Sequence, residues 1–94
     1  MRQIEKIRKQ IDKIDDEILN RLSERLRLAI KISRFKSKIR DDSREKEIIL
    51  RVRKKANELW PLRPEFSVQI FRLIIEESRS IQEKPPIMRK IFIC

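Results

Sequence analysis

Hydrophobic residues recur at intervals of three and four along the first third of the chain. They are Ile4, Ile7, Ile11, Ile14, Ile18 and Leu22, and the run resumes at Ala29 and Ile32. This spacing places the side chains on one face of a helix. Because neither proline nor glycine interrupts the pattern, it predicts one helix from about Arg2 to about Ile39.

The length of this predicted helix indicates that the chain has a partner. At 1.5 Å per residue the helix would be about 55 Å long. A compact domain of this chain length has a radius of gyration near 12 Å and is only about 30 Å across. The rest of the chain is therefore too short to cover the apolar face, and we expect a second copy to cover it in an intertwined homodimer.

A second helix is predicted after a short connection at residues 37–42. Asp42 or Ser43 can cap its first turn, and Pro61 stops it. Its apolar positions have helical spacing and are Ile48, Ile49, Val52, Ala56 and Leu59. This segment is expected to be shorter than the first helix.

A third helix is predicted near residues 65–83. Pro64 suits its first turn, and Pro85 and Pro86 stop it. Its inner side would carry Val68, Phe71, Ile74, Ile75 and Ser78. The chain is thus expected to be all-α, with one long and two shorter helices in one domain over residues 1–84. Residues 85–94 would form an apolar tail of unknown role.

Composition narrows the classes of function. The net charge of +10 makes nucleic acid a default partner for a small helical protein. However, 15 acidic residues are interleaved with the 25 basic ones, which also fits a solvated surface or a cationic pocket. The chain has no histidine and a single cysteine, Cys94, so we expect no internal disulfide, no cysteine-based metal site, and no zinc or imidazole chemistry.

The ends and the hydropathy of the chain bear on its location. The N-terminus is charged and lacks the apolar stretch of a signal peptide, and no apolar run is long enough to span a membrane. We therefore expect a cytoplasmic protein that does not bind membranes.

Two cations interrupt the apolar face of the first helix. Arg25 lies between Leu22 and Ala29, and Lys36 follows Ile32 by four residues. Eleven residues separate the two cations, so they point in directions only about 20° apart and lie about 16 Å apart along the axis. A charge on a buried face needs a partner, and no acid continues this face. The pattern indicates an anion from outside the chain.

Arg8 is a third candidate ligand for that anion. It precedes Arg25 by seventeen residues, or about 25 Å of helix, which is too far to share a small ligand within one chain. In an antiparallel dimer it could reach the second subunit's copy of Arg25. Ser78 and Gln82, one turn apart on the third helix, add neutral hydrogen-bonding groups beside Ile75.

Each of these features also has an ordinary structural explanation. Taken alone, Arg25 can extend its charged end to solvent, and Lys36 can lie exposed near a helix end. The sequence from Asp42 to Glu45 has the spacing of a helix cap, and Ser78 and Gln82 can contact water. The combination of the features is what favours a binding site.

In combination these segments resemble the small all-helical chorismate mutases. The resemblance covers Ile4 to Glu83 and is carried by five short motifs in order. They are Ile7–Asp15, Ser23–Ala29, Ile32 with Lys36, Arg40–Glu45, and Phe71–Ser78 followed by Gln82. The connection before Asp41 is shorter than in some relatives, and residues 85–94 have no recognised counterpart.

The resemblance implies a reaction and roles for particular residues. The reaction is the Claisen rearrangement of chorismate to prephenate, in the biosynthesis of phenylalanine and tyrosine, without metal or cofactor. Arg8 of a neighbouring subunit and Arg25 would bind substrate carboxylates, and Lys36 and Gln82 would donate hydrogen bonds to the ether oxygen. The remaining expected contacts are Glu45 and Asp41 near the ring hydroxyl with Arg44 beside them, Ser78 on a carboxylate, and Ile32 and Ile75 on the ring. Lys36, Gln82, Arg25 and Glu45 are the expected catalytic residues.

Three alternatives remain at this point. An isochorismate-pyruvate lyase would have a similar pocket on the same fold. A basic helical dimer could instead bind nucleic acid, with an affinity that falls steeply with salt. A purely structural dimerisation module would tolerate leucine in place of Arg25 and Lys36.

Overall fold

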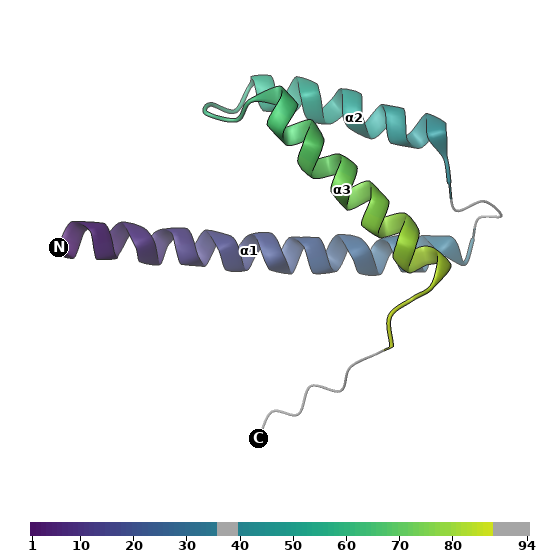
Figure 1. The fold of residues 1–94 in the computed structure, drawn as a ribbon, viewed down its shortest axis with the longest axis horizontal. Coiled ribbons are helices and arrows are strands. Elements are labelled where there is room, and N and C mark those ends of the chain that lie inside the picture. Colours follow the sequence, from purple (N-terminus) through teal and green to yellow (C-terminus); the bar gives the residue numbers. More distant parts are fainter. Residues whose placement is uncertain (36–39, 88–94) are drawn as a thin grey trace.

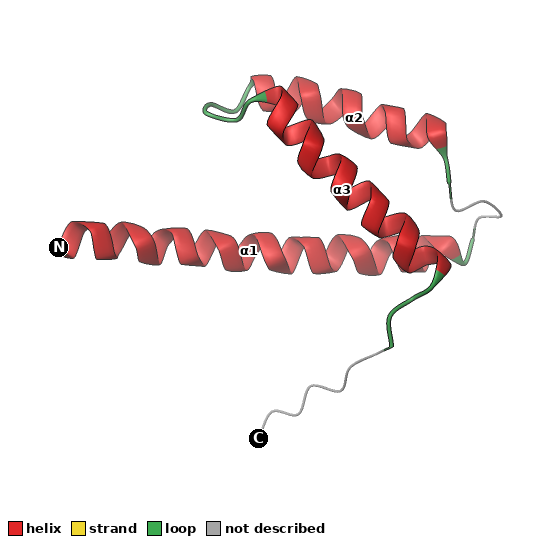
Figure 2. Ribbon diagram, in the orientation of Figure 1, coloured by secondary structure: helices red, strands yellow, loops and turns green. Residues whose placement is uncertain are grey.

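The chain forms three helices, described here by a computed structural model at residues 1–35 and 40–87 (Figure 1). They are α1 (Arg2–Ser33), α2 (Asp42–Asn57) and α3 (Pro64–Glu83). Figure 2 shows that helices and loops account for all the described residues, which contain no strand. The all-α prediction is confirmed over this part of the chain. Within it, no helix combines the length and the apolar character needed to cross a membrane.

The first helix is shorter than predicted. It ends at Ser33 rather than near Ile39, and the last turn tightens into bonds between residues three apart. The N–H of Arg34 donates to the carbonyl of Lys31 at 3.2 Å, and the N–H of Phe35 donates to that of Ile32 at 3.0 Å. Such bonds are common where a helix ends without glycine. Lys36 belongs to residues 36–39, which lie outside the described part.

The cap of α2 is Asp41 rather than the expected Asp42 or Ser43. Asp41 has extended backbone angles, with φ −129° and ψ 94°, and its Oδ1 accepts a hydrogen bond from the N–H of Arg44 at 3.0 Å. This satisfies one of the N–H groups that a helix leaves free at its start. Asp42 is instead the first helical residue, and its carboxylate accepts a hydrogen bond from Arg40.

The core lies between α2 and α3. It consists of Ile48, Val52, Val68 and Ile75, with Ile49 and Phe71 packed against it. The predicted inner sides of both helices are therefore largely confirmed. Leu59 is an exception, because it lies beyond the end of α2 and remains 45% exposed. The third helix begins at Pro64 and ends at Glu83, close to the predicted limits.

The chain has an open, flat shape. In Figure 1, α3 runs diagonally from the end of α2 to the C-terminal part of α1, and it packs against both helices. The dimensions are 54 × 44 × 15 Å and the radius of gyration is 16.7 Å, well above the about 12 Å of a compact chain this long. The N-terminal half of α1 extends away from α2 and α3 (Figure 1).

The apolar face of α1 remains exposed in the single chain. No residue of α1 is buried. The isoleucines of its N-terminal half are between 43% and 55% exposed, and they are Ile4, Ile7, Ile11, Ile14 and Ile18. A face of this size normally marks an interaction site. A second copy of the chain would cover it, and the homodimer stays a prediction.

Candidate active site

A cavity of about 250 Å³ lies where the three helices approach one another. Eight of the ten predicted site residues line it, and they are Arg25, Ile32, Asp41, Arg44, Glu45, Ile75, Ser78 and Gln82. The other four lining residues are Leu28, Ala29, Ile48 and Arg79. Residues that are distant in sequence therefore meet around one small space with charged, polar and apolar walls.

Arg25 is the cation that α1 contributes to this cavity. Burial lowers the pKa of its guanidinium, and the positive charges of Arg44 and Arg51 lower it further. The group nevertheless stays protonated, because a guanidinium does not lose its proton in proteins. Partly buried cations that repel one another are stabilised by an anion between them. The electrostatics of the cavity thus favour a negatively charged ligand.

A serine on α3 orients this arginine. Arg25 Nη1 donates a hydrogen bond to Ser78 Oγ at 3.1 Å, and Ser78 Oγ donates to the carbonyl of Ile74 at 2.7 Å. A serine hydroxyl has one proton, and here that proton is used within α3. Ser78 therefore acts in this structure as an acceptor that fixes the direction of the guanidinium.

Gln82 forms the second polar link between α1 and α3. Its Nε2 donates a hydrogen bond to the carbonyl of Ala29 at 2.8 Å. A side-chain amide nitrogen carries two N–H groups. One of them holds Gln82 against α1, and the second remains available for a ligand in the cavity that Gln82 lines.

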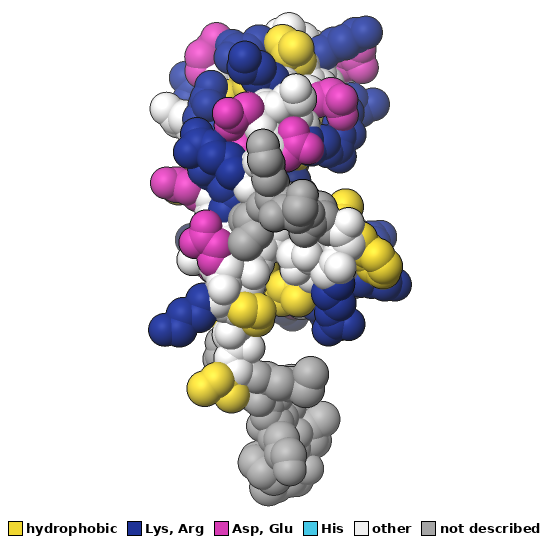
Figure 3. Space-filling model, turned by 90° about the vertical axis from the view of Figure 1, so that its right-hand side faces the viewer, with side chains coloured by type: hydrophobic (Ala, Val, Ile, Leu, Met, Phe, Trp, Pro, Cys, Tyr) yellow, Lys and Arg dark blue, Asp and Glu magenta, His cyan; other side chains and the backbone are white. Residues whose placement is uncertain are grey.

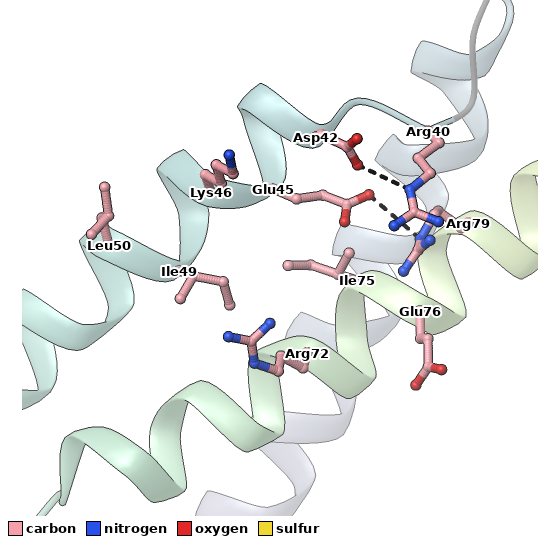
Figure 4. A pocket seen from close by; sticks show the side chains of 10 residues that line it. All are labelled: Arg40, Asp42, Glu45, Lys46, Ile49, Leu50, Arg72, Ile75, Glu76 and Arg79. Atoms are coloured by element: carbon pink, nitrogen blue, oxygen red, sulfur yellow. Dashed lines mark hydrogen bonds and ion pairs between the residues drawn. The ribbon is translucent and has the colours of Figure 1, made fainter.

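The start of α2 supplies the acidic side of the cavity. Asp41 caps the helix, and Glu45 follows one turn later. The carboxylate of Glu45 lies 3.4 Å from Arg79 Nε on α3, and both side chains are mostly buried (22% and 27% exposed). Figure 4 shows the two side chains pointing toward each other.

Arg79 is not among the site residues predicted from the sequence. The signal for it was present, because Arg79 follows Ile75 by four residues and precedes Gln82 by three, which places it on the same helix face. Its partner could not be read from the sequence, since Glu45 lies on another helix. The charge surplus of the chain made one more arginine look like part of a solvated surface.

A larger cavity of about 740 Å³ adjoins the first one and is shown in Figure 4. Glu45, Ile75 and Arg79 line both cavities. At its rim Arg40 donates a 2.9 Å hydrogen bond to Asp42, which lowers the pKa of that carboxyl and raises the pKa of Arg40. The larger space holds only two of the predicted residues, so the smaller cavity is the better candidate site.

Comparison with known proteins agrees with this geometry. The family model described as chorismate mutase type II matches residues 7–83. The chain belongs to this family. No solved structure matches it.

Three named relatives of this chorismate mutase domain are similar over most of its length. A bifunctional chorismate mutase/prephenate dehydratase of Aquifex aeolicus is 40% identical over 92 residues, covering 89% of this chain and 25% of the relative. A chorismate mutase of Methanocaldococcus jannaschii is 35% identical over 82 residues, covering 83% of this chain and 82% of the relative. A bifunctional chorismate mutase/prephenate dehydratase of Buchnera aphidicola is 39% identical over 84 residues, covering 82% of this chain and 21% of the relative.

The chain thus spans about a quarter of the Aquifex protein and a fifth of the Buchnera protein. The predicted resemblance to the chorismate mutases is confirmed.

Of the two remaining predicted site residues, only Arg8 belongs to the part of the chain that the structure describes. Arg8 lies on the exposed N-terminal half of α1, away from Arg25 of the same chain. Lys36 lies outside the described residues. Within the described ranges, no group of three or more acidic or cysteine side chains is arranged to hold a metal ion.

Proposed function

We propose that the 250 Å³ cavity binds chorismate and rearranges it to prephenate. The observation that carries the proposal is the meeting of eight predicted residues around one space, with Arg25 oriented by Ser78. The substrate has two carboxylates, an ether oxygen and a ring hydroxyl. Guanidinium groups bind carboxylates with two parallel hydrogen bonds, so Arg25 and Arg44 suit the charged end of this molecule.

The rearrangement needs no nucleophile and no metal, because a carbon–oxygen bond breaks while a carbon–carbon bond forms within one molecule. The protein has to hold the enolpyruvyl arm over the ring, which is a positioning effect. Ile32 and Ile75 provide apolar walls for that ring. The absence of histidine from the sequence is therefore no obstacle to catalysis.

Negative charge develops on the ether oxygen as its bond to carbon breaks. We assign Gln82 and Lys36 as the hydrogen-bond donors for this charge. A donor fixed in advance contributes roughly 3–4 kcal/mol to lowering the barrier. The bond from Gln82 to Ala29 supports this role, because it fixes the amide before substrate arrives. Glu45 is proposed to orient the ring hydroxyl.

The proposed active unit is a homodimer in which the long helices pair in antiparallel fashion. The exposed isoleucines of α1 support this arrangement, since a second copy of the same helix would cover them. Arg8 of the partner subunit would then reach the cavity that holds Arg25. Each site would contain residues from two chains.

The direct test follows the ultraviolet absorbance of chorismate with purified protein. We expect wild-type chain to consume chorismate and release prephenate, and Lys36→Ala to lower kcat by about two orders of magnitude. Isochorismate is assayed in parallel, because release of pyruvate from it would identify the lyase instead. A folded protein that turns over neither compound would refute the assignment.

A further inference from the structure

Arg79 and Glu45 join α2 to α3 at the wall between the two cavities. Both residues line both cavities, and Arg79 Nε lies 3.4 Å from Glu45 Oε2. The Nε atom is buried and makes no aligned hydrogen bond within the described residues. The contact is therefore an ion pair that a small rotation of either side chain would turn into a charge-assisted hydrogen bond.

Two further charges surround this pair at the start of α2. The hydrogen bond between Arg40 and Asp42 is the main cause that lowers the pKa of Asp42 and raises the pKa of Arg40. The charge of Arg79 adds a smaller lowering for Asp42, and the charge of Glu45 adds a smaller raising for Arg40. Arg40 and Asp42 are themselves joined by a 2.9 Å hydrogen bond (Figure 4). Two acids and two bases thus form one cluster, in which Arg79 is the member contributed by α3.

We propose that Arg79 is a positioning residue for the rearrangement, which holds the carboxylate of Glu45 in the orientation that receives the substrate hydroxyl. This inference rests on the proposed function. A glutamate side chain samples many rotamers in solvent, and fixing it in advance lowers the cost of binding substrate correctly. The arginine is placed for this role because its guanidinium reaches Glu45 from the opposite helix.

The geometry favours this role over direct contact between Arg79 and a substrate carboxylate. Its buried Nε lies 3.4 Å from Glu45 Oε2, so the guanidinium already has an anion within the protein. Arg25, by contrast, is fixed by neutral Ser78 and forms no ion pair with a carboxylate among the described residues. Arg79, which has a carboxylate beside it, is thus suited to position Glu45, whereas Arg25 is suited to bind the anionic substrate.

A double-mutant cycle on kcat and KM tests the proposal, with Arg79→Gln, Glu45→Gln and the double variant. We expect Arg79→Gln to lower kcat about tenfold with a small change in KM, and to have little further effect once Glu45 is replaced, as contacting residues couple. Arg79→Lys should recover part of the loss, because it keeps the charge but not the planar fork.

Arg72→Gln is the matched control. Arg72 lies two turns before Arg79 on α3 and lines only the larger cavity, so its replacement should leave kcat and KM unchanged. Circular dichroism and thermal unfolding of each variant show that it is folded.

Additive effects of the two replacements, or a loss confined to KM, would overturn the positioning role and assign Arg79 to the substrate. Unchanged kinetics with lower thermal stability would make the pair purely structural. Wild-type protein that fails to convert chorismate would overturn the proposed function as well, so the two failures are distinguishable.

Discussion

At the scale of single residues, Gln82 is the most informative member of the site. It is an uncharged amide, it is already bonded to α1, and it has a second N–H to offer. A glutamate at this position would have to be protonated before it could donate to the ether oxygen. The residue type alone therefore predicts how the rate depends on pH.

We expect kcat of the wild-type chain to vary little between about pH 5 and pH 8, because no histidine is present to titrate there. Gln82→Glu should lose activity at neutral pH and regain it as the pH falls toward the carboxyl pKa, ordinarily about 4.3. The measurement is a pH profile of kcat for both proteins. A wild-type rate that collapses between mildly acidic and neutral pH would contradict the role of Gln82.

The residue types in the sequence predicted much of the candidate site but not Arg79. Arg25, Ser78 and Gln82 stood out because a cation on an apolar face and a polar pair one turn apart are unusual. Arg79 did not stand out, since its significance depends on the packing of α3 against α2. An ion pair between two helices depends on tertiary packing, so a local sequence pattern does not reveal it.

At the scale of elements, Asp41 at the start of α2 belongs both to a helix cap and to the cavity. The same side chain caps the helix and lines the cavity. Asp41→Ala should lower the free energy of unfolding by about 1 kcal/mol, whereas Asp41→Asn should keep most of the cap. Ser43→Ala, which removes the hydroxyl of a residue once expected to be the cap, should change it by less than about 0.5 kcal/mol.

Chemical denaturation of the three variants provides these values. A larger loss for Ser43→Ala than for Asp41→Ala would show that the cap lies where the sequence suggested.

The helix ends show what a sequence pattern can predict and what it cannot. Proline placed the start of α3 correctly, because its ring fixes the backbone of a first turn. No such residue marks the end of α1, and the alternation of apolar and charged residues continues beyond Ser33. The helix ends through hydrogen bonds of Arg34 and Phe35 to the preceding turn, which periodicity does not reveal.

At the scale of the whole molecule, a division of each site between two chains can be tested by mixing. Arg8→Ala and Arg25→Ala should each be inactive as pure proteins. A mixed dimer of the two would contain one site with both defects and one intact site. Unfolding and refolding the two variants together should therefore restore about a quarter of wild-type activity, since half of the dimers would be mixed.

Each variant refolded alone is the control for this experiment. Size-exclusion chromatography with light scattering verifies that both remain dimeric. Mixed dimers without recovered activity would show that Arg8 and Arg25 serve the same chain or that Arg8 has no role.

The charge on one face of the molecule bears on the choice between a small anionic ligand and nucleic acid. Figure 3 shows basic and acidic side chains interspersed over the face that presents the start of α2. A nucleic-acid binder would be expected to gather its cations along one stripe. At the cavity, Arg25 and Arg44 lie close enough for the charge of Arg44 to lower the pKa of Arg25 after burial has done so.

The central position of α3 has a consequence for the order of folding. The α2–α3 contact closes a loop of only six residues, 58–63, whereas Arg25 and Ser78 are 53 residues apart. The entropy of closing the longer loop costs roughly 2 kcal/mol more. We therefore expect the α2–α3 hairpin to form early and α1 to dock late. The proposed active-site cavity would then be among the last features to be completed, so we expect the onset of activity during refolding to report the docking of α1.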